Sequence, residues 1–233
     1  MISPFDEDIP HRSAAERKRR AEREIRRITA ENPHFIPLRL IYKRNLAQSF
    51  WGRAWNRNLD TYQDYDSRLD RGRTHLRAGA VVNLQMIGPE VEAHVWDDRL
   101  YAVSATFAPL EPEKWALFRK ESAGELDSLV ALLQGKASES LLARIVDPVK
   151  GLFPDRKALT YRCTCIDDAE LCEHIAAVLY GIGVCFDENA ELFFPLRGVS
   201  IHDWLQTSGE CLLQELGPPE SQALGELFDI DLL

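Results

Sequence analysis

The chain has 233 residues, of which 45% are hydrophobic, and a formal net charge of −9 at pH 7. This length and apolar content suffice for a buried core, which excludes disorder over the whole chain. The first ten residues are acidic and lack the apolar segment of a signal peptide, and no apolar run approaches the roughly 18 residues of a membrane span. We therefore expect a soluble, cytoplasmic protein that has no membrane partner.

The charges are divided unevenly along the chain. Residues 1–77 contain 17 Lys or Arg against 11 Asp or Glu, a balance of +6, whereas residues 78–233 contain 11 against 26, a balance of −15. The N-terminal part is therefore the part suited to contact with a polyanion such as nucleic acid.

Residues 1–34 are predicted to form a charged N-terminal extension, with a frayed helix or tail over residues 11–30. An amphipathic helix follows, because aromatic and leucine side chains recur at intervals of four, four and three residues. These side chains belong to Trp51, Trp55, Leu59 and Tyr62, and the helix is expected to end near Tyr65. At helical spacing we assign the two tryptophans to the core in preference to stacking on bases.

An antiparallel β-meander is predicted at residues 74–108. Its strands are residues 80–87, 91–96 and 100–108. Gly88-Pro89 and Asp97-Asp98 separate them as turn signals. Helices are predicted over residues 111–146, so residues 35–150 are expected to form an α+β domain.

Four residues of metal-ligand type fall within twelve positions, at Cys163, Cys165, Cys172 and His174. Cys163 and Cys165 are two apart, so on an extended segment both thiolates leave the same face. On a regular helix the same spacing would separate Cys172 from His174, so Cys172 is expected at or before a helix cap and His174 in the first turn. Three thiolates and one imidazole make a closed tetrahedral set for Zn²⁺. The sequence therefore predicts a structural zinc site.

Two other interpretations of this cluster stay open. In one, the four residues are ordinary buried side chains, although ligand-type residues at matched spacings seldom gather by chance. In the other, they bind a [2Fe–2S] cluster, which spacing does not exclude. Cys185 lies eleven residues beyond His174 and is expected to be a packed thiol instead of a ligand.

The order Cys-x-Cys, a variable gap, Cys-x-His and an apolar helix resembles the SWIM zinc finger. The sequences GLFP at residues 151–154, IAAVLYGIG at 175–183, FWGRAW at 50–55 and RGR at 71–73 are similar to bacterial SWIM proteins, and the likeness covers residues 45–206. The resemblance implies a small ββα zinc-binding module at residues 151–206. It also implies binding to DNA, RNA or protein, and a role beside a Swi/Snf-type helicase or ATPase.

Nucleic-acid contacts are expected outside the finger, because its gap carries Asp167, Asp168 and Glu170, whose charges repel phosphate. The arginines that precede the meander are assigned to phosphate contact. They are Arg68, Arg71, Arg73 and Arg77. The alternative for these four is a solvated, flexible turn.

The common phosphate-binding, dinucleotide-binding, zinc-protease and serine-hydrolase motifs are absent from the sequence. We therefore expect a zinc-binding adaptor for nucleic acid or protein and not an enzyme. The alternative is a protein-only scaffold with a purely structural zinc site. Residues 207–233 are predicted to form an acidic C-terminal tail, in which Leu227, Phe228, Ile230 and Leu232 either dock on a partner or close the fold.

Overall fold

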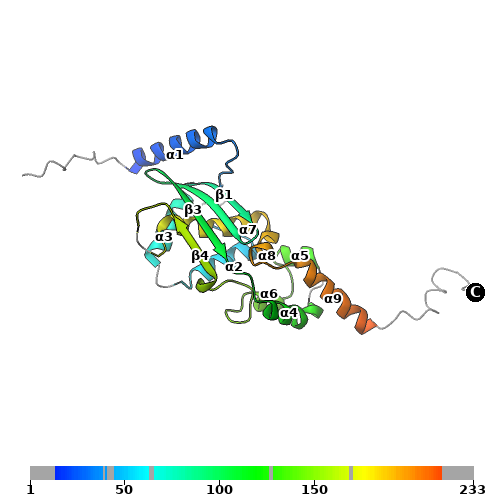
Figure 1. Cartoon of the computed structure of the whole chain (residues 1–233). Helices are drawn as coiled ribbons and strands as arrows, with labels where there is room; N and C mark the ends of the chain where they lie inside the picture. The colour runs from blue at the N-terminus through cyan, green and yellow to red at the C-terminus, as the bar shows by residue number, and fades with distance from the viewer. Residues whose placement is uncertain are drawn as a thin grey trace, which may run out of the picture.

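The computed structural model describes residues 14–38, 40, 45–62, 66–125, 128–167 and 170–216, and it confirms the predicted α+β class (Figure 1). The helices are α1 (Ala14–Glu31), α2 (Phe50–Leu59), α3 (Asp66–Arg77), α4 (Pro112–Glu121), α5 (Leu129–Leu133), α6 (Glu139–Ile145), α7 (Glu173–Glu188), α8 (Phe193–Leu196) and α9 (Ile201–Leu216). The strands are β1 (Val81–Ile87), β2 (Glu90–Trp96), β3 (Leu100–Phe107) and β4 (Leu159–Cys163).

The four strands form one antiparallel sheet in the order β1-β2-β3-β4. The first three are the predicted meander. β4 pairs with β3, with Val103 opposite Cys163 and Phe107 opposite Leu159. In the described part of residues 151–206, the predicted ββα module thus has one strand of its own, and β3 supplies the other. This pairing covers an edge of the meander that would otherwise expose unpaired backbone groups.

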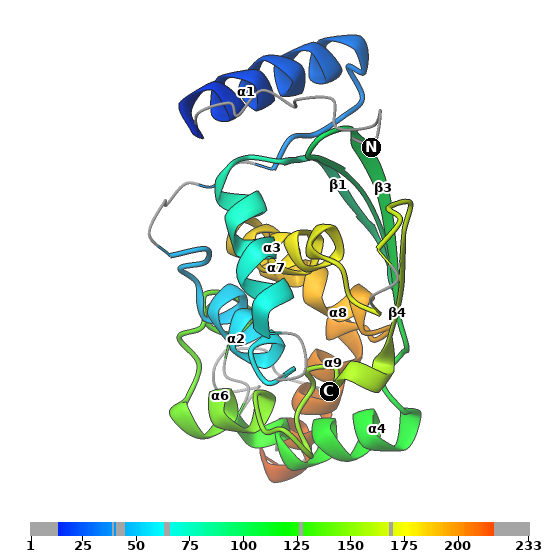
Figure 2. The same ribbon diagram turned by 90° about the vertical axis from the view of Figure 1, so that its left-hand side faces the viewer.

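Helix α7 lies at the centre of the molecule, between the sheet on one side and α2 and α3 on the other (Figure 2). Of its 16 residues, 12 are buried. A helix that is apolar around its whole circumference needs such cover on every side. The main core therefore forms around α7 and draws on residues from Leu46 to Trp204.

Glycines let two helices approach α7 closely. A Cβ added at Gly72 in α3 would lie 2.4 Å from the Cβ of Ala176. A Cβ added at Gly52 in α2 would lie 2.5 Å from the carbonyl oxygen of Gly183. Real Cβ atoms do not approach other atoms this closely, so the spacing of the three helices depends on these glycines.

The aromatic stripe of α2 belongs to the core, as predicted. Trp51 and Trp55 are fully buried, and the Trp55 Nε1 donates a hydrogen bond of 2.7 Å to the carbonyl oxygen of Leu179 in α7. Neither ring is therefore free to stack on a base. The helix ends at Leu59 and not near Tyr65.

Residues 66–77 form helix α3, so the meander begins at Val81 instead of residue 74. Leu69 and Leu76 are buried and share with Gly72 the face that meets α7, at the three- and four-residue spacings of a helix. Arginines occupy several of the remaining positions, so the composition of this segment is charged and does not indicate a helix with a narrow apolar face.

Helix α1 confirms a helix in the charged N-terminal segment, where Ile28 packs with Val82 and Trp96 in a second, smaller core. Val95 faces the main core and its neighbour Trp96 the smaller one. Adjacent strand residues point to opposite faces, so α1 covers the side of the sheet that faces away from α7.

Helix α9 runs through residues 207–216, which the sequence assigned to an acidic tail. It is anchored by Trp204, whose ring centroid lies 5.2 Å from that of Phe118 and 6.0 Å from that of Trp115, both in α4. Residues 217–233 lie outside the described residues, and with them the apolar residues from Leu227 onward that were expected either to dock on a partner or to close the fold.

We predict that Gly72→Ala lowers the free energy of unfolding by about 1–3 kcal/mol, the usual cost of overpacking. Alanine is the better helix former by about 1 kcal/mol, so a net loss of stability would point to the close contact with Ala176 and Ala177 of α7. Chemical denaturation measures the change, with the exposed Ser67→Ala in the same helix as control. A Gly72→Ala variant as stable as the wild type would contradict the close approach of α3 to α7.

Candidate metal centre

The four predicted ligands come together at one end of α7. Each of Cys163, Cys165, Cys172 and His174 offers a ligand atom, and these atoms all lie within 4.8 Å of one another. Cys163 ends β4, Cys165 follows in a bend, and the other two residues begin α7. The residues are therefore placed to share one metal ion. Cys185 is not in this group and packs against the main core, as predicted.

The strand end aims the first two sulfurs at the same point. Cys163 and Cys165 are partly buried while Thr164 between them is exposed, which is the alternation of an extended chain. The backbone of Thr164 donates a hydrogen bond of 3.1 Å to the carbonyl oxygen of Ala102. Its hydroxyl accepts one of 3.0 Å from the Ala102 amide. β3 therefore holds the strand end in place just beyond the last ladder pair.

Cys172 is the N-cap of α7, as predicted. Its sulfur accepts a hydrogen bond of 3.5 Å from the Ile175 amide, one of the amides that a helix start leaves without a partner. The hydrogen bond with Cys163 lowers the pKa of Cys172, and the same contact raises the pKa of Cys163. One thiolate of the pair is therefore stabilised by the fold itself, at a helix end that favours negative charge.

His174 is oriented through both ring nitrogens. Its Nδ1 lies 3.8 Å from the Cys163 sulfur and 3.9 Å from the Cys172 sulfur. Its Nε2 is buried without a hydrogen bond and lies 3.7 Å from a carboxylate oxygen of Asp97. Burial alone would lower the pKa of His174, but contacts with Asp97 and Cys172 raise it to about 10. The distances show that Nδ1 is the nitrogen that faces the sulfurs and that Nε2 faces Asp97.

The turn between β2 and β3 supplies the surroundings of this imidazole. The Tyr101 ring stacks on the His174 ring with centroids 4.2 Å apart, and its hydroxyl donates a 2.7 Å hydrogen bond to Asp98. The contact with His174 lowers the pKa of Asp97. Sequence reasoning took Asp97 and Asp98 only as turn signals, because nothing in the local pattern shows that this turn lies over the start of α7.

A second set of ligand-type side chains adjoins the first and shares His174 with it. The set is His75, Asp97, Glu173 and His174. Its Glu173 also binds Arg71 and lies 3.8 Å from the Nε2 of His75. These residues surround the imidazole with charge on the side away from the sulfurs.

The four arginines assigned to phosphate contact all lie on α3, but they do not act together. Arg68 forms an ion pair of 2.6 Å with Asp167, and Arg71 one of 3.4 Å with Glu173. Arg73 pairs with Asp60 and Asp70. Arg77 lines a cleft between α2 and α3. Two of the four therefore bind acidic residues of the finger itself. These ion pairs partly neutralise the positive charge of the N-terminal segment.

Comparison with known proteins adds little to this geometry. No protein-family model matches the chain, and no solved structure matches it. A stretch of 163 residues is 28% identical to "Uncharacterized protein Rv2102" of Mycobacterium tuberculosis. The matched stretch covers 69% of this chain and 58% of that protein. None of the helices in the described part of the chain is long and apolar enough to cross a bilayer.

We predict that a chelator makes Cys172, whose pKa the fold lowers, react with iodoacetamide while Cys185 stays unmodified. Burial raises the pKa of Cys185 to about 12, so this thiol is protonated and unreactive at neutral pH. Peptide mapping by mass spectrometry follows each thiol separately. Labelling of Cys185 at the rate of Cys172 would contradict a local opening and show that α7 unfolds as a whole.

Proposed function

We propose that Cys163, Cys165, Cys172 and His174 bind one Zn²⁺ ion in a closed structural site. The supporting observation is that their donor atoms lie within 4.8 Å of one another around a largely buried imidazole. Three thiolates and one imidazole complete the tetrahedral set that zinc prefers. Asp97 stands where a carboxylate commonly orients a zinc-bound histidine from behind.

A closed site has a structural role, because no coordination position is left for water or a substrate. We infer that the protein is an adaptor and not an enzyme. The SWIM-like order of its ligands supports a role in binding nucleic acid, protein or both, beside a Swi/Snf-type ATPase. The zinc would join β4 to the start of α7 and so hold the sheet against the central helix.

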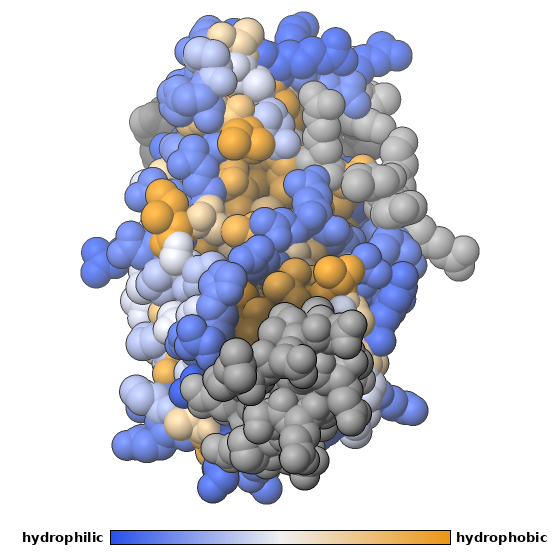
Figure 3. Space-filling view, turned by 90° about the vertical axis from the view of Figure 1, so that its right-hand side faces the viewer, coloured by the Kyte–Doolittle hydropathy of each residue, from blue (hydrophilic) through white to orange (hydrophobic). Residues whose placement is uncertain are grey.

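A protein-only scaffold is the second candidate. The face shown in Figure 3 exposes hydrophobic residues in its middle, with hydrophilic residues crossing between them, and exposed apolar surface often marks contact with another protein. Capture of partners from the native host, with and without nuclease, separates the two candidates. Partners that persist after nuclease treatment favour the scaffold, and partners lost with the nucleic acid favour the nucleic-acid adaptor.

We predict about one Zn²⁺ per chain in protein purified from its native host. Cys165→Ser should lose the metal, whereas Cys185→Ser, the matched change outside the site, should keep it. Metal binding to small zinc domains is worth on the order of 10 kcal/mol, so losing one ligand should also destabilise the start of α7. Elemental analysis that finds no zinc, or an iron absorption band, would overturn the proposal.

We predict that Asp97→Asn weakens zinc binding by about 10–100-fold, the usual effect of losing the partner of a ligating histidine. Competition with a zinc chelator of known affinity measures the change. Glu92→Gln removes an exposed carboxylate from the same hairpin and should leave the affinity unchanged. Equal affinities for the Asp97→Asn and wild-type proteins would show that Asp97 does not orient His174.

A further inference from the structure

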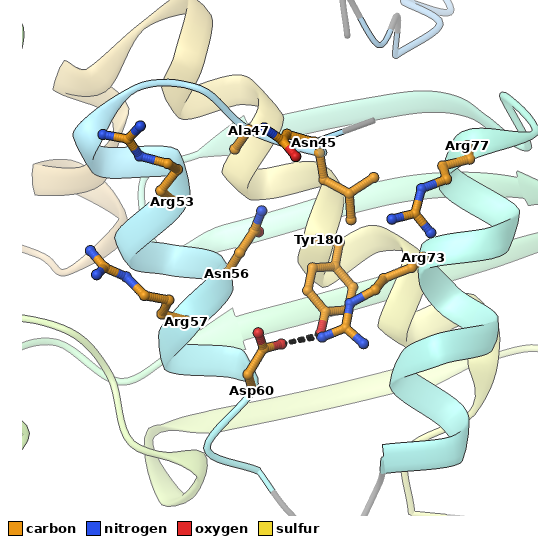
Figure 4. A pocket seen from close by; sticks show the side chains of 10 residues that line it. Asn45, Ala47, Arg53, Asn56, Arg57, Asp60, Arg73, Arg77 and Tyr180 are labelled. Atoms are coloured by element: carbon orange, nitrogen blue, oxygen red, sulfur yellow. Dashed lines mark hydrogen bonds and ion pairs between the residues drawn. The ribbon is translucent and has the colours of Figure 1, made fainter. Parts of the chain in front are cut away.

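A cleft between α2 and α3 gathers four arginines on the side of these helices away from the sheet (Figure 4). Its volume is about 500 Å³. The charged residues that line it are Arg53 and Arg57 of α2, Arg73 and Arg77 of α3, and Asp60. Four cations against one carboxylate leave the cleft positive, although the chain as a whole carries a charge of −9.

One arginine is fixed in the floor of the cleft. The Tyr180 hydroxyl of α7 donates a hydrogen bond of 2.6 Å to Asp60, and Arg73 forms an ion pair with the same carboxylate. The guanidinium of Arg73 lies over the Tyr180 ring, 4.7 Å from its centroid. Arg73 is therefore held by three contacts, with Asp60, Asp70 and the Tyr180 ring, and the two carboxylates neutralise its charge.

The other three arginines are available to a ligand. Arg53, Arg57 and Arg77 are exposed, and none of them forms an ion pair with a described residue. Exposed cations that repel one another on a rigid surface raise the local concentration of anions. A guanidinium presents paired N–H donors that match the oxygens of a phosphate.

The arrangement of these side chains favours an extended polyanion over a compact one. Arg77 reaches from α3 toward the cleft, whereas Arg53 and Arg57 project from α2 on the side away from α3 (Figure 4). The three guanidiniums therefore do not converge on one point where a single phosphate group would sit. A strand that enters the cleft and crosses α2 would meet them in turn.

We propose that the α2–α3 cleft, with Arg53, Arg57 and Arg77, contacts the phosphates of a single-stranded nucleic acid. This inference rests on the nucleic-acid role proposed above and assigns a surface to it. The Asn45 and Asn56 amides line the same cleft and offer donors and acceptors to unpaired base edges. Arg68 and Arg71 do not belong to this surface, because their partners are Asp167 and Glu173 beside the metal centre.

The test is a salt titration of binding between the full chain and a fluorescently labelled single-stranded oligonucleotide. The variant is Arg53→Gln/Arg57→Gln/Arg77→Gln. Its matched control is Arg19→Gln/Arg23→Gln/Arg26→Gln, which removes the same charge from exposed positions of α1. Zinc content and thermal melting show that both variants keep the fold, and the three single variants repeat the test with less perturbation.

The cleft variant should bind roughly tenfold more weakly or worse, and its plot of log affinity against log salt should be shallower by about 2, since each phosphate contact contributes about 0.7 for single strands. The α1 control should keep nearly the wild-type slope of log affinity against log salt, because it changes the net charge of the chain but removes no phosphate contact. Binding by the cleft variant equal to the wild type, or an equal loss in the α1 control, would overturn the assignment of the surface.

Two further outcomes separate this inference from the function on which it rests. A wild-type protein that binds no nucleic acid at low salt would overturn the nucleic-acid role and the cleft together. Tighter binding to a duplex than to a single strand, lost in the cleft variant, would overturn the single-strand assignment and support the surface.

Discussion

The burial of α7 is the constraint on which the rest of the structure depends. An apolar helix of 16 residues must be covered on every side, and this chain covers it with the sheet, with α2 at Gly52 and with α3 at Gly72. Two of the four candidate ligands lie at its start, Cys172 as the N-cap and His174 in the first turn. The packing that buries α7 therefore also brings Cys172 and His174 close to Cys163 and Cys165 at the end of β4.

The same packing decides what the arginines do. Because α3 crosses the start of α7, Arg68 and Arg71 lie beside the acidic residues of the finger and pair with them. Because α2 lies on the other side of this crossing, a second group of arginines is left around a cleft with Tyr180 in its floor. Metal binding and the proposed phosphate contacts thus belong to different surfaces of the three helices, although both depend on α7.

The parts of the site that could be predicted are those that depend on local spacing. Cys163 and Cys165 alternate along a strand, and Cys172 caps a helix whose apolar sequence is continuous, so the chain itself dictates these positions. The strands of the meander follow from their turn signals in the same way. Asp97, Tyr101 and the pairing of β4 with β3 could not be predicted, because each depends on contacts between segments more than fifty residues apart. Arg68 and Arg71 of α3 show the same limit: their charge is plain in the sequence, but their partners lie about a hundred residues away.

X-ray absorption at the zinc edge of the purified protein tests the central claim most directly, because it counts the atoms bound to the metal. A closed site made by Cys163, Cys165, Cys172 and His174 predicts three sulfur ligands at about 2.3 Å and one nitrogen at about 2.0–2.1 Å, with no oxygen. A spectrum with fewer than three sulfurs, or with an oxygen ligand from water, would contradict a closed structural site at the start of α7.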